Sequence, residues 1–217
     1  MLKTGWYIFC RTLCFIFIWI FLRLRFFGLS NIPRKGAFLL ISNHQSFFDP
    51  LFVGTRARRT LVFMARDTLF KKKFFGGLIR SVKAIPVRRG EADLAAIRNI
   101  IDHLKKGQSV CLFPEGTRSP DGRISDFKPG FGLLARRANV PILPAVIDGA
   151  FEAWPRDKKF PSFGKTILIK YGEPISIEQI KDLDDKQLAK FVTNRLRQMQ
   201  NECRTKAGKE PYAYDNL

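Results

Sequence analysis

The chain of 217 residues suits one domain, and its hydrophobic content of 46% is sufficient for a buried core. A formal net charge of +19 at pH 7 points to a partner rich in phosphate, either a nucleic acid or an anionic membrane. The four cysteines lack the spacing of metal ligands, so we expect reduced thiols rather than disulfides or a zinc centre.

The first segment, Gly5 to Leu22, is strongly apolar and aromatic but is interrupted by Arg11. Three interpretations stay open: a single-pass anchor, a helix that lies in or re-enters the membrane plane, and a buried core helix. Aromatic residues near the two ends, such as Trp6 and Trp19, suit the membrane interface and favour the second. No small-residue cleavage site follows, which argues against a signal peptide.

A short apolar strand over 37–41 precedes a polar loop that carries His44. Asp49 and Pro50 are typical of a helix start, with Asp as the N-cap and Pro as the first helical residue. This arrangement brings an imidazole and a carboxylate within hydrogen-bond reach. A carboxylate on one ring nitrogen fixes the tautomer and leaves the other nitrogen to take a proton, so His44 and Asp49 form a candidate general base with its orienting group.

The rest of the chain shows further apolar patterns. They predict strands over 60–65, 83–87, 109–112, 140–147 and 165–171. They also predict helices over 50–57, 91–106 and 184–204, and a further helix that follows Gly130 and ends at Asn139. Pro144 predicts that the strand over 140–147 lies at a sheet edge or carries a bulge. Cations beside Phe pairs over 66–79 suit membrane headgroups, and we expect the residues after Gly208 to be frayed.

A second polar loop follows the strand over 109–112 and has the sequence Phe-Pro-Glu-Gly-Thr-Arg-Ser from Phe113 to Ser119. Two polar loops after two buried strands are expected at one edge of a sheet, where open α/β folds keep their sites. A plainer alternative is that Glu115 and Arg118 pair with each other and that Gly116 makes a turn.

The sequence Asn43-His44-x4-Asp49, followed by Phe113-Pro114-Glu115-Gly116-Thr117-Arg118-Ser119, resembles the glycerolipid acyltransferase family, most closely its 1-acyl-sn-glycerol-3-phosphate acyltransferases. Weaker family blocks have counterparts at 84–90 and 140–145, so the resemblance covers about 33–173. It implies an α/β fold with a central, mostly parallel or mixed sheet flanked by helices. It also implies a membrane-associated helical segment over 1–32 and a catalytic domain over 33–217.

The resemblance implies transfer of an acyl chain from acyl-CoA or acyl-carrier protein, as co-substrate, to the sn-2 hydroxyl of 1-acyl-glycerol-3-phosphate. The product would be phosphatidic acid, with no resident cofactor or metal. His44 would be the base and Asp49 its orienting group. The residues expected to hold the substrate are Arg88, Glu115, Gly116, Thr117, Arg118 and Lys128. Arg89 is the alternative to Arg88, one position out of register.

We expect the chain at an anionic membrane surface, with its active site at the cytoplasmic face of a bacterial inner membrane. Within the family, glycerol-3-phosphate or another lysolipid is an alternative acceptor. A basic nucleic-acid-binding protein is an alternative from another class, but charge alone supports it, so we expect no nucleic-acid partner. A non-catalytic membrane-surface protein is a further alternative, which the intact His44, Asp49 and Glu115 disfavour.

Overall fold

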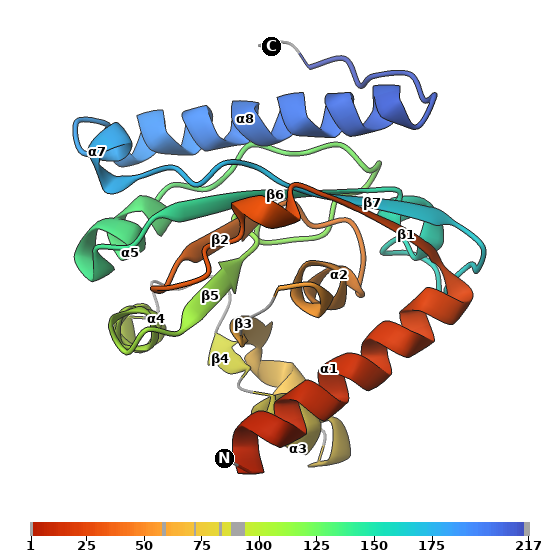
Figure 1. Cartoon of the computed structure of the whole chain (residues 1–217), viewed down its shortest axis with the longest axis horizontal. Helices are drawn as coiled ribbons and strands as arrows, with labels where there is room; N and C mark the ends of the chain where they lie inside the picture. The colour runs from red at the N-terminus through yellow and green to blue at the C-terminus, as the bar shows by residue number, and fades with distance from the viewer. Residues whose placement is uncertain (1, 58–59, 72, 83, 88–93, 215–217) are drawn as a thin grey trace.

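The fold is built on one mixed sheet of seven strands, in a computed structural model that describes residues 2–57, 60–71, 73–82, 84–87 and 94–214 (Figure 1). In spatial order the sheet runs β1-β7-β6-β2-β5-β3-β4. The strands are β1 (Arg23–Phe27), β2 (Leu39–Ser42), β3 (Leu61–Arg66), β4 (Ile85–Val87), β5 (Ser109–Leu112), β6 (Ile142–Asp148) and β7 (Thr166–Tyr171). Neighbouring strands pair in parallel except β6 and β7, which confirms the expected α/β class.

Helices cover both faces of this sheet. They are α1 (Leu2–Phe21), α2 (Asp49–Thr55), α3 (Lys73–Ser81), α4 (Leu94–Lys105), α5 (Phe131–Ala138), α6 (Ala150–Ala153), α7 (Ile177–Ile180) and α8 (Asp185–Lys206), with short 3-10 turns at Leu29–Asn31 and Asp67–Lys71. One core lies under α4, α5 and α8, and a second lies under α1 and α2 (Figure 1). Central strands such as β2 are buried on both faces, so they have continuous apolar sequences rather than alternating ones.

The segment after α1 belongs to the sheet. Strand β1 pairs in parallel with β7, with Arg23 opposite Thr166, and only Leu22 separates it from α1. Gly28 then turns the chain with a φ of 66°, and a Cβ there would lie 2.0 Å from the carbonyl oxygen of Tyr171. Residues 23–27, which we expected in the helical segment over 1–32, therefore form an edge strand of the sheet that carries the site.

Helix α1 is amphipathic in its packing. Its inner side is tied down by polar groups, because the Tyr7 hydroxyl accepts from the Leu61 N–H at 3.1 Å and Arg11 donates to the Ala57 carbonyl at 2.7 Å. Its exposed apolar side chains are Trp6, Ile8, Phe9, Leu13, Ile16, Trp19, Ile20 and Phe21. The interpretation of this segment as a buried core helix is therefore wrong. None of the helices in the described parts of the chain has the length and apolar character needed to cross a membrane.

The expected edge position or bulge for the strand with Pro144 is wrong. Strand β6 lies inside the sheet, between β2 and β7. Its antiparallel pairing with β7 begins at Ala145, and the Pro144 carbonyl accepts from the Gly172 N–H at 2.8 Å. The N–H and C=O of one strand residue point to the same side, so the Pro144 nitrogen, which carries no hydrogen, faces the end of β7. That position lies beyond the residues that pair β6 with β7. The proline therefore removes no hydrogen bond between the paired strands.

The expectation that the residues after Gly208 are frayed is also wrong for residues 209–214, and 215–217 lie outside the described residues. The Tyr214 hydroxyl accepts from the Ile124 N–H at 2.9 Å and donates to Gln200 Oε1 at 2.5 Å. Tyr212 lies under the Arg204 guanidinium, 3.7 Å from the ring centroid. Two aromatic anchors therefore fasten this segment across α8 and the loop before α5.

Candidate active site

The candidate site lies where β2 and β5 end. These strands are parallel neighbours, with Leu40 opposite Cys111, so the loops that follow them leave the sheet at the same edge. The loop after β2 carries His44, and the loop after β5 carries Glu115 and Arg118. The two motifs, about seventy positions apart in the sequence, are therefore brought together.

His44 is half-buried and forms a pair with Asp49, which is fully buried. The His44 Nδ1 atom lies 2.7 Å from Asp49 Oδ2, and the side chains are 18% and 0% exposed. The imidazole stacks on Phe113 with ring centroids 4.4 Å apart, which fixes the ring plane. A carboxylate on Nδ1 selects the tautomer with a proton there and leaves Nε2, on the outer edge of the ring, to accept one.

Asp49 is not the N-cap that the sequence predicts. It is the first residue of α2, and its Oδ2 turns back to accept from the N–H groups of Gln45 at 2.5 Å and Ser46 at 2.7 Å. The cap position is Phe48, which has no side-chain acceptor. The carboxylate is used by the loop rather than by the helix, because the tight turn from His44 to Asp49 aims two backbone donors at it.

Glu115 joins the second motif to the first. Its Oε1 accepts from the His44 N–H at 2.7 Å, and its Oε2 accepts from the Ser125 N–H at 3.2 Å. Burial raises the pKa of Glu115 to about 7, although the hydrogen bonds from His44 and Ser125 lower it. Glu115 therefore holds the His44 loop in place through its carboxylate.

Basic side chains surround the turn at Gly116 and Thr117. Gly116 has a φ of 71°, and a Cβ there would lie 3.2 Å from the Lys128 Nζ. The Arg118 guanidinium lies 6.0 Å from the Phe47 ring centroid. Arg156 donates to the Thr117 hydroxyl at 3.5 Å. Cations from three different segments thus converge on one polar turn.

These three cations are available to an anion. Across the described ranges, neither Arg118, Lys128 nor Arg156 forms an ion pair with a carboxylate, so Arg118 does not pair with Glu115. Guanidinium and ammonium groups bind phosphate through charge-assisted hydrogen bonds. Arg88 and its alternative Arg89 lie outside the described residues.

The sequence assigned no role to several residues that shape the site. Asn43 accepts from the Ile147 N–H at 2.8 Å and donates to the Ile147 carbonyl at 2.9 Å, which fastens the end of β2 to β6. Gln45 donates to the Gly122 carbonyl at 2.5 Å, and Gln200 on α8 donates to the same carbonyl at 2.9 Å. Asn43 and Gln45 both lie in the first motif, but their long-range partners are visible only in the fold.

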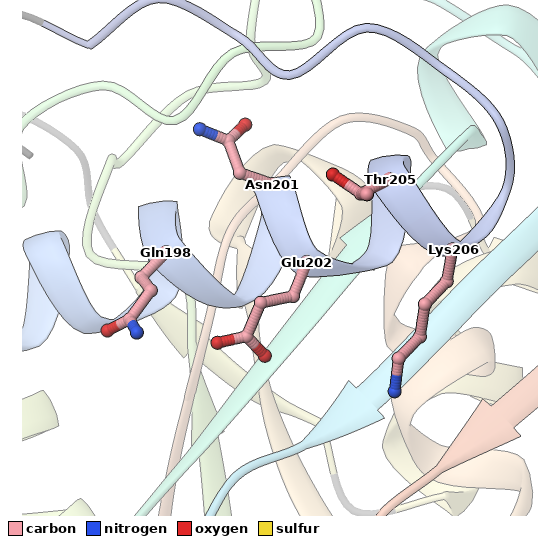
Figure 2. Close-up of a pocket in the computed structure, with 5 residues that line it drawn as sticks. All are labelled: Gln198, Asn201, Glu202, Thr205 and Lys206. Atoms are coloured by element: carbon pink, nitrogen blue, oxygen red, sulfur yellow. The ribbon is translucent and has the colours of Figure 1, made fainter.

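A groove elsewhere on the molecule is lined by α8. It has a volume of about 670 Å³, and its lining residues are Gln198, Asn201, Glu202, Thr205 and Lys206. In Figure 2 the side chains of Gln198, Glu202 and Lys206 follow one another along one side of the helix. Glu202 pairs there with Lys170 of β7. None of the expected site residues that the structure describes lines this groove.

The fold and the paired loops define a member of a known family. Residues 23–148, more than half of the chain, match the family described as Acyltransferase. The chain belongs to the acyltransferase family.

Particular relatives in this family carry one recurrent name. A 1-acyl-sn-glycerol-3-phosphate acyltransferase of Streptococcus pneumoniae is 30% identical over 77% of this chain and 61% of its own length. The protein of the same name from Bacillus subtilis is 28% identical over 82% of this chain and 86% of its own. The chain spans only 40% of the chloroplastic LPAT1 of Arabidopsis thaliana.

A solved structure shares the fold. It is the crystal structure of the 1-acyl-sn-glycerophosphate (LPA) acyltransferase PlsC from Thermotoga maritima, with a TM-score of 0.73 and 29% identity. The match covers 86% of this chain and 74% of the Thermotoga chain. The similarity therefore extends beyond the two motif loops to most of the sheet and its helices.

Proposed function

We propose that this chain transfers an acyl group from an acyl thioester to the sn-2 hydroxyl of 1-acyl-glycerol-3-phosphate, which yields phosphatidic acid. The observation that carries the proposal is the 2.7 Å contact of His44 with buried Asp49, beside cations that form no ion pair within the described residues. The names of the relatives from Streptococcus pneumoniae and Bacillus subtilis support this acceptor.

The proposed chemistry is a direct transfer assisted by one base. His44 Nε2 takes the proton of the sn-2 hydroxyl as that oxygen attacks the thioester carbonyl carbon. The C–S bond then breaks, and the thiolate leaves with the proton that His44 returns. Asp49 stabilises the transient imidazolium through Nδ1. A positioned base of this kind contributes about 10²–10⁴-fold to the rate.

The acceptor phosphate is proposed to lie at the cation cluster. Arg118 and Lys128 flank the Gly116 turn, and Arg88 is proposed to complete the site. Gly116 lets the backbone approach the substrate without a Cβ, and Thr117 offers a hydroxyl. Glu115 is proposed to hold the His44 loop in place against the acceptor glycerol.

The donor is proposed to be acyl-CoA or acyl-carrier protein, each of which presents the same thioester. No resident cofactor or metal is needed in this scheme, because the base and the cations supply proton transfer and phosphate binding. The described residues contain no group of three or more His, Cys, Asp or Glu side chains arranged to hold a metal ion.

We also propose that the exposed apolar side of α1 rests on an anionic membrane surface, at the cytoplasmic face of a bacterial inner membrane. Trp19 is 65% exposed and Ile20 is 62% exposed, and both follow the part of α1 that carries Arg11. Such a helix gains from burying apolar side chains at the headgroup boundary, and the net charge of +19 favours anionic lipids.

The test is an acyl-transfer assay on detergent-solubilised protein. 1-Acyl-glycerol-3-phosphate and glycerol-3-phosphate compete as acceptors, with acyl-CoA and acyl-carrier protein offered in parallel. Preference for the lysolipid, lost in His44→Ala, is the expected result. Preference for glycerol-3-phosphate would keep the base and overturn the acceptor. Full activity of His44→Ala would overturn the base.

A further inference from the structure

The loop between α6 and β7 exposes aromatic side chains among cations. Phe160 is 73% exposed and Phe163 is 52% exposed, which are high values for side chains of this size. The stretch from Trp154 to Gly164 contains one Arg, two Lys and one Asp. We refer to residues 154–163 as the aromatic loop.

The aromatic loop is closed on itself. The Ser162 N–H donates to the Ala153 carbonyl at 2.7 Å, and the Trp154 indole N–H donates to the Lys158 carbonyl at 2.9 Å. Two prolines, Pro155 and Pro161, restrict the backbone inside these closures. Phe160 therefore lies on a loop whose backbone is held by hydrogen bonds and prolines.

The aromatic loop bridges the end of α1 and the candidate active site. At one end, the Gly164 N–H donates to the Phe21 carbonyl at 2.8 Å, and the Phe21 and Phe163 rings lie 4.7 Å apart. At the other end, Trp154 packs on Phe47 of the His44 loop, with ring centroids 5.4 Å apart. The exposed apolar side of α1 thus continues through this loop toward His44.

The chemistry of the loop fits a lipid surface. Lys158 and Lys159 are exposed, and the Lys159 ammonium lies 5.8 Å from the Phe160 ring centroid. Phenylalanine rings gain by leaving water for the acyl boundary, while adjacent ammonium groups stay with anionic headgroups. A loop that faces only water would gain nothing from two exposed Phe side chains beside an exposed apolar helix.

We propose that the aromatic loop inserts Phe160 and Phe163 into the interface of an anionic lipid bilayer, as a second lipid contact next to the opening of the active site. This inference rests on the proposed action at a membrane surface. It places the acceptor lipid and His44 on the same side of the protein, with the loop between α1 and the site.

The experiment reads lipid contact at the loop directly. Cys10→Ser and Cys14→Ser remove the half-buried thiols of α1, and Cys111 and Cys203 are buried. In this background, Phe160→Cys is labelled with an environment-sensitive fluorophore and the full chain is placed on phosphatidylcholine vesicles with or without phosphatidylglycerol. Phe191→Cys is the matched control, because Phe191 is 45% exposed and belongs to α8. Helix α8 covers the face of the sheet opposite to the one that α1 covers (Figure 1).

The expected result is a shift of the emission at position 160 to shorter wavelength, with quenching by brominated acyl chains. The shift is expected to be larger on vesicles with phosphatidylglycerol and to shrink in Lys158→Gln/Lys159→Gln. Emission at position 160 that matches position 191 would overturn the proposal. A shift caused by acyl-carrier protein and not by vesicles would overturn it in favour of a protein partner. Acyl transfer is assayed separately on unlabelled chain, so each proposal can fail without the other.

Discussion

The backbone N–H of His44 donates a 2.7 Å hydrogen bond to Oε1 of Glu115, so the carboxylate of one motif holds the peptide of the other. The ring of His44 is oriented separately, by Asp49. Glu115 therefore holds the His44 loop, and we expect any influence of Glu115 on turnover to pass through the placement of that loop.

The raised pKa of Glu115 gives a testable pH dependence of stability. Burial raises this pKa to about 7 from 4.5, so the folded state binds more protons than the unfolded state between these values. Stability from this group is therefore full below about pH 4.5 and is lost as the pH rises toward 7, by about 3 kcal/mol. Glu115→Gln removes this loss.

The measurement is the unfolding free energy in detergent solution at about pH 5 and about pH 8 for both chains. We expect the native chain to lose more stability than Glu115→Gln over this interval. Parallel pH profiles for the two chains would contradict the buried, titrating carboxylate.

Substitutions of Asp49 separate catalysis from folding. Asp49→Asn keeps an oxygen for the N–H groups of Gln45 and Ser46 but lacks the charge that stabilises an imidazolium. We expect kcat to fall by about 10²–10⁴-fold with little loss of stability. Asp49→Ala leaves both N–H groups unpaired and should also lower the unfolding free energy by about 2–4 kcal/mol. Equal stability losses in the two variants would contradict the loop-anchoring role.

Arg156 is predicted to assist phosphate binding, because its guanidinium reaches the Thr117 hydroxyl at 3.5 Å. Arg156→Ala and Arg118→Ala should each raise the acceptor KM roughly tenfold with a smaller effect on kcat. Arg137→Ala, at an exposed position of α5, is the matched control for loss of one positive charge. An acceptor KM for Arg156→Ala equal to that of Arg137→Ala would remove Arg156 from the site.

Gln200 is predicted to stabilise the fold next to the site, because it binds the same Gly122 carbonyl as Gln45 of the His44 loop. It donates to the Gly122 carbonyl at 2.9 Å and to Asp148 Oδ1 at 3.1 Å, and it accepts from the Tyr214 hydroxyl at 2.5 Å. Gln200→Leu leaves these three groups without this partner and should lower the unfolding free energy by about 2–3 kcal/mol.

The matched control for Gln200→Leu is Gln198→Leu, an exposed position on the same helix. Thermal or denaturant unfolding distinguishes the two variants. Similar stabilities for both would show that the contacts of Gln200 contribute nothing measurable.

The local chemistry of the site was predictable from the sequence. The apolar run at β5 matches the predicted strand residue for residue, from Ser109 to Leu112. The interval from His44 to Asp49 predicts the imidazole–carboxylate contact, because a tight turn into a helix brings positions five apart together. Strong local patterns thus located the His44–Asp49 pair and the strands that present it.

The failures arose from long-range partners. Strand β1 has the sequence Arg-Leu-Arg-Phe-Phe and pairs with β7 near position 166, far along the chain, so no local pattern marks it as part of the sheet. Pro144 is tolerated only because β7 ends beside it. The segment with Tyr214 is ordered by Gln200 and Ile124.

Because β1 belongs to the sheet, residues 1–27 cannot be deleted to test membrane binding without also removing an edge strand.

The single residue between α1 and β1 has a further consequence. Because Leu22 is buried and α1 continues into a paired strand without a linker, the helix has no hinge on which to swing. Where α1 rests on a lipid surface as proposed, the fold fixes the distance between His44 and that surface. The reacting end of the lipid must therefore leave the bilayer surface to reach His44, because His44 cannot move toward the bilayer.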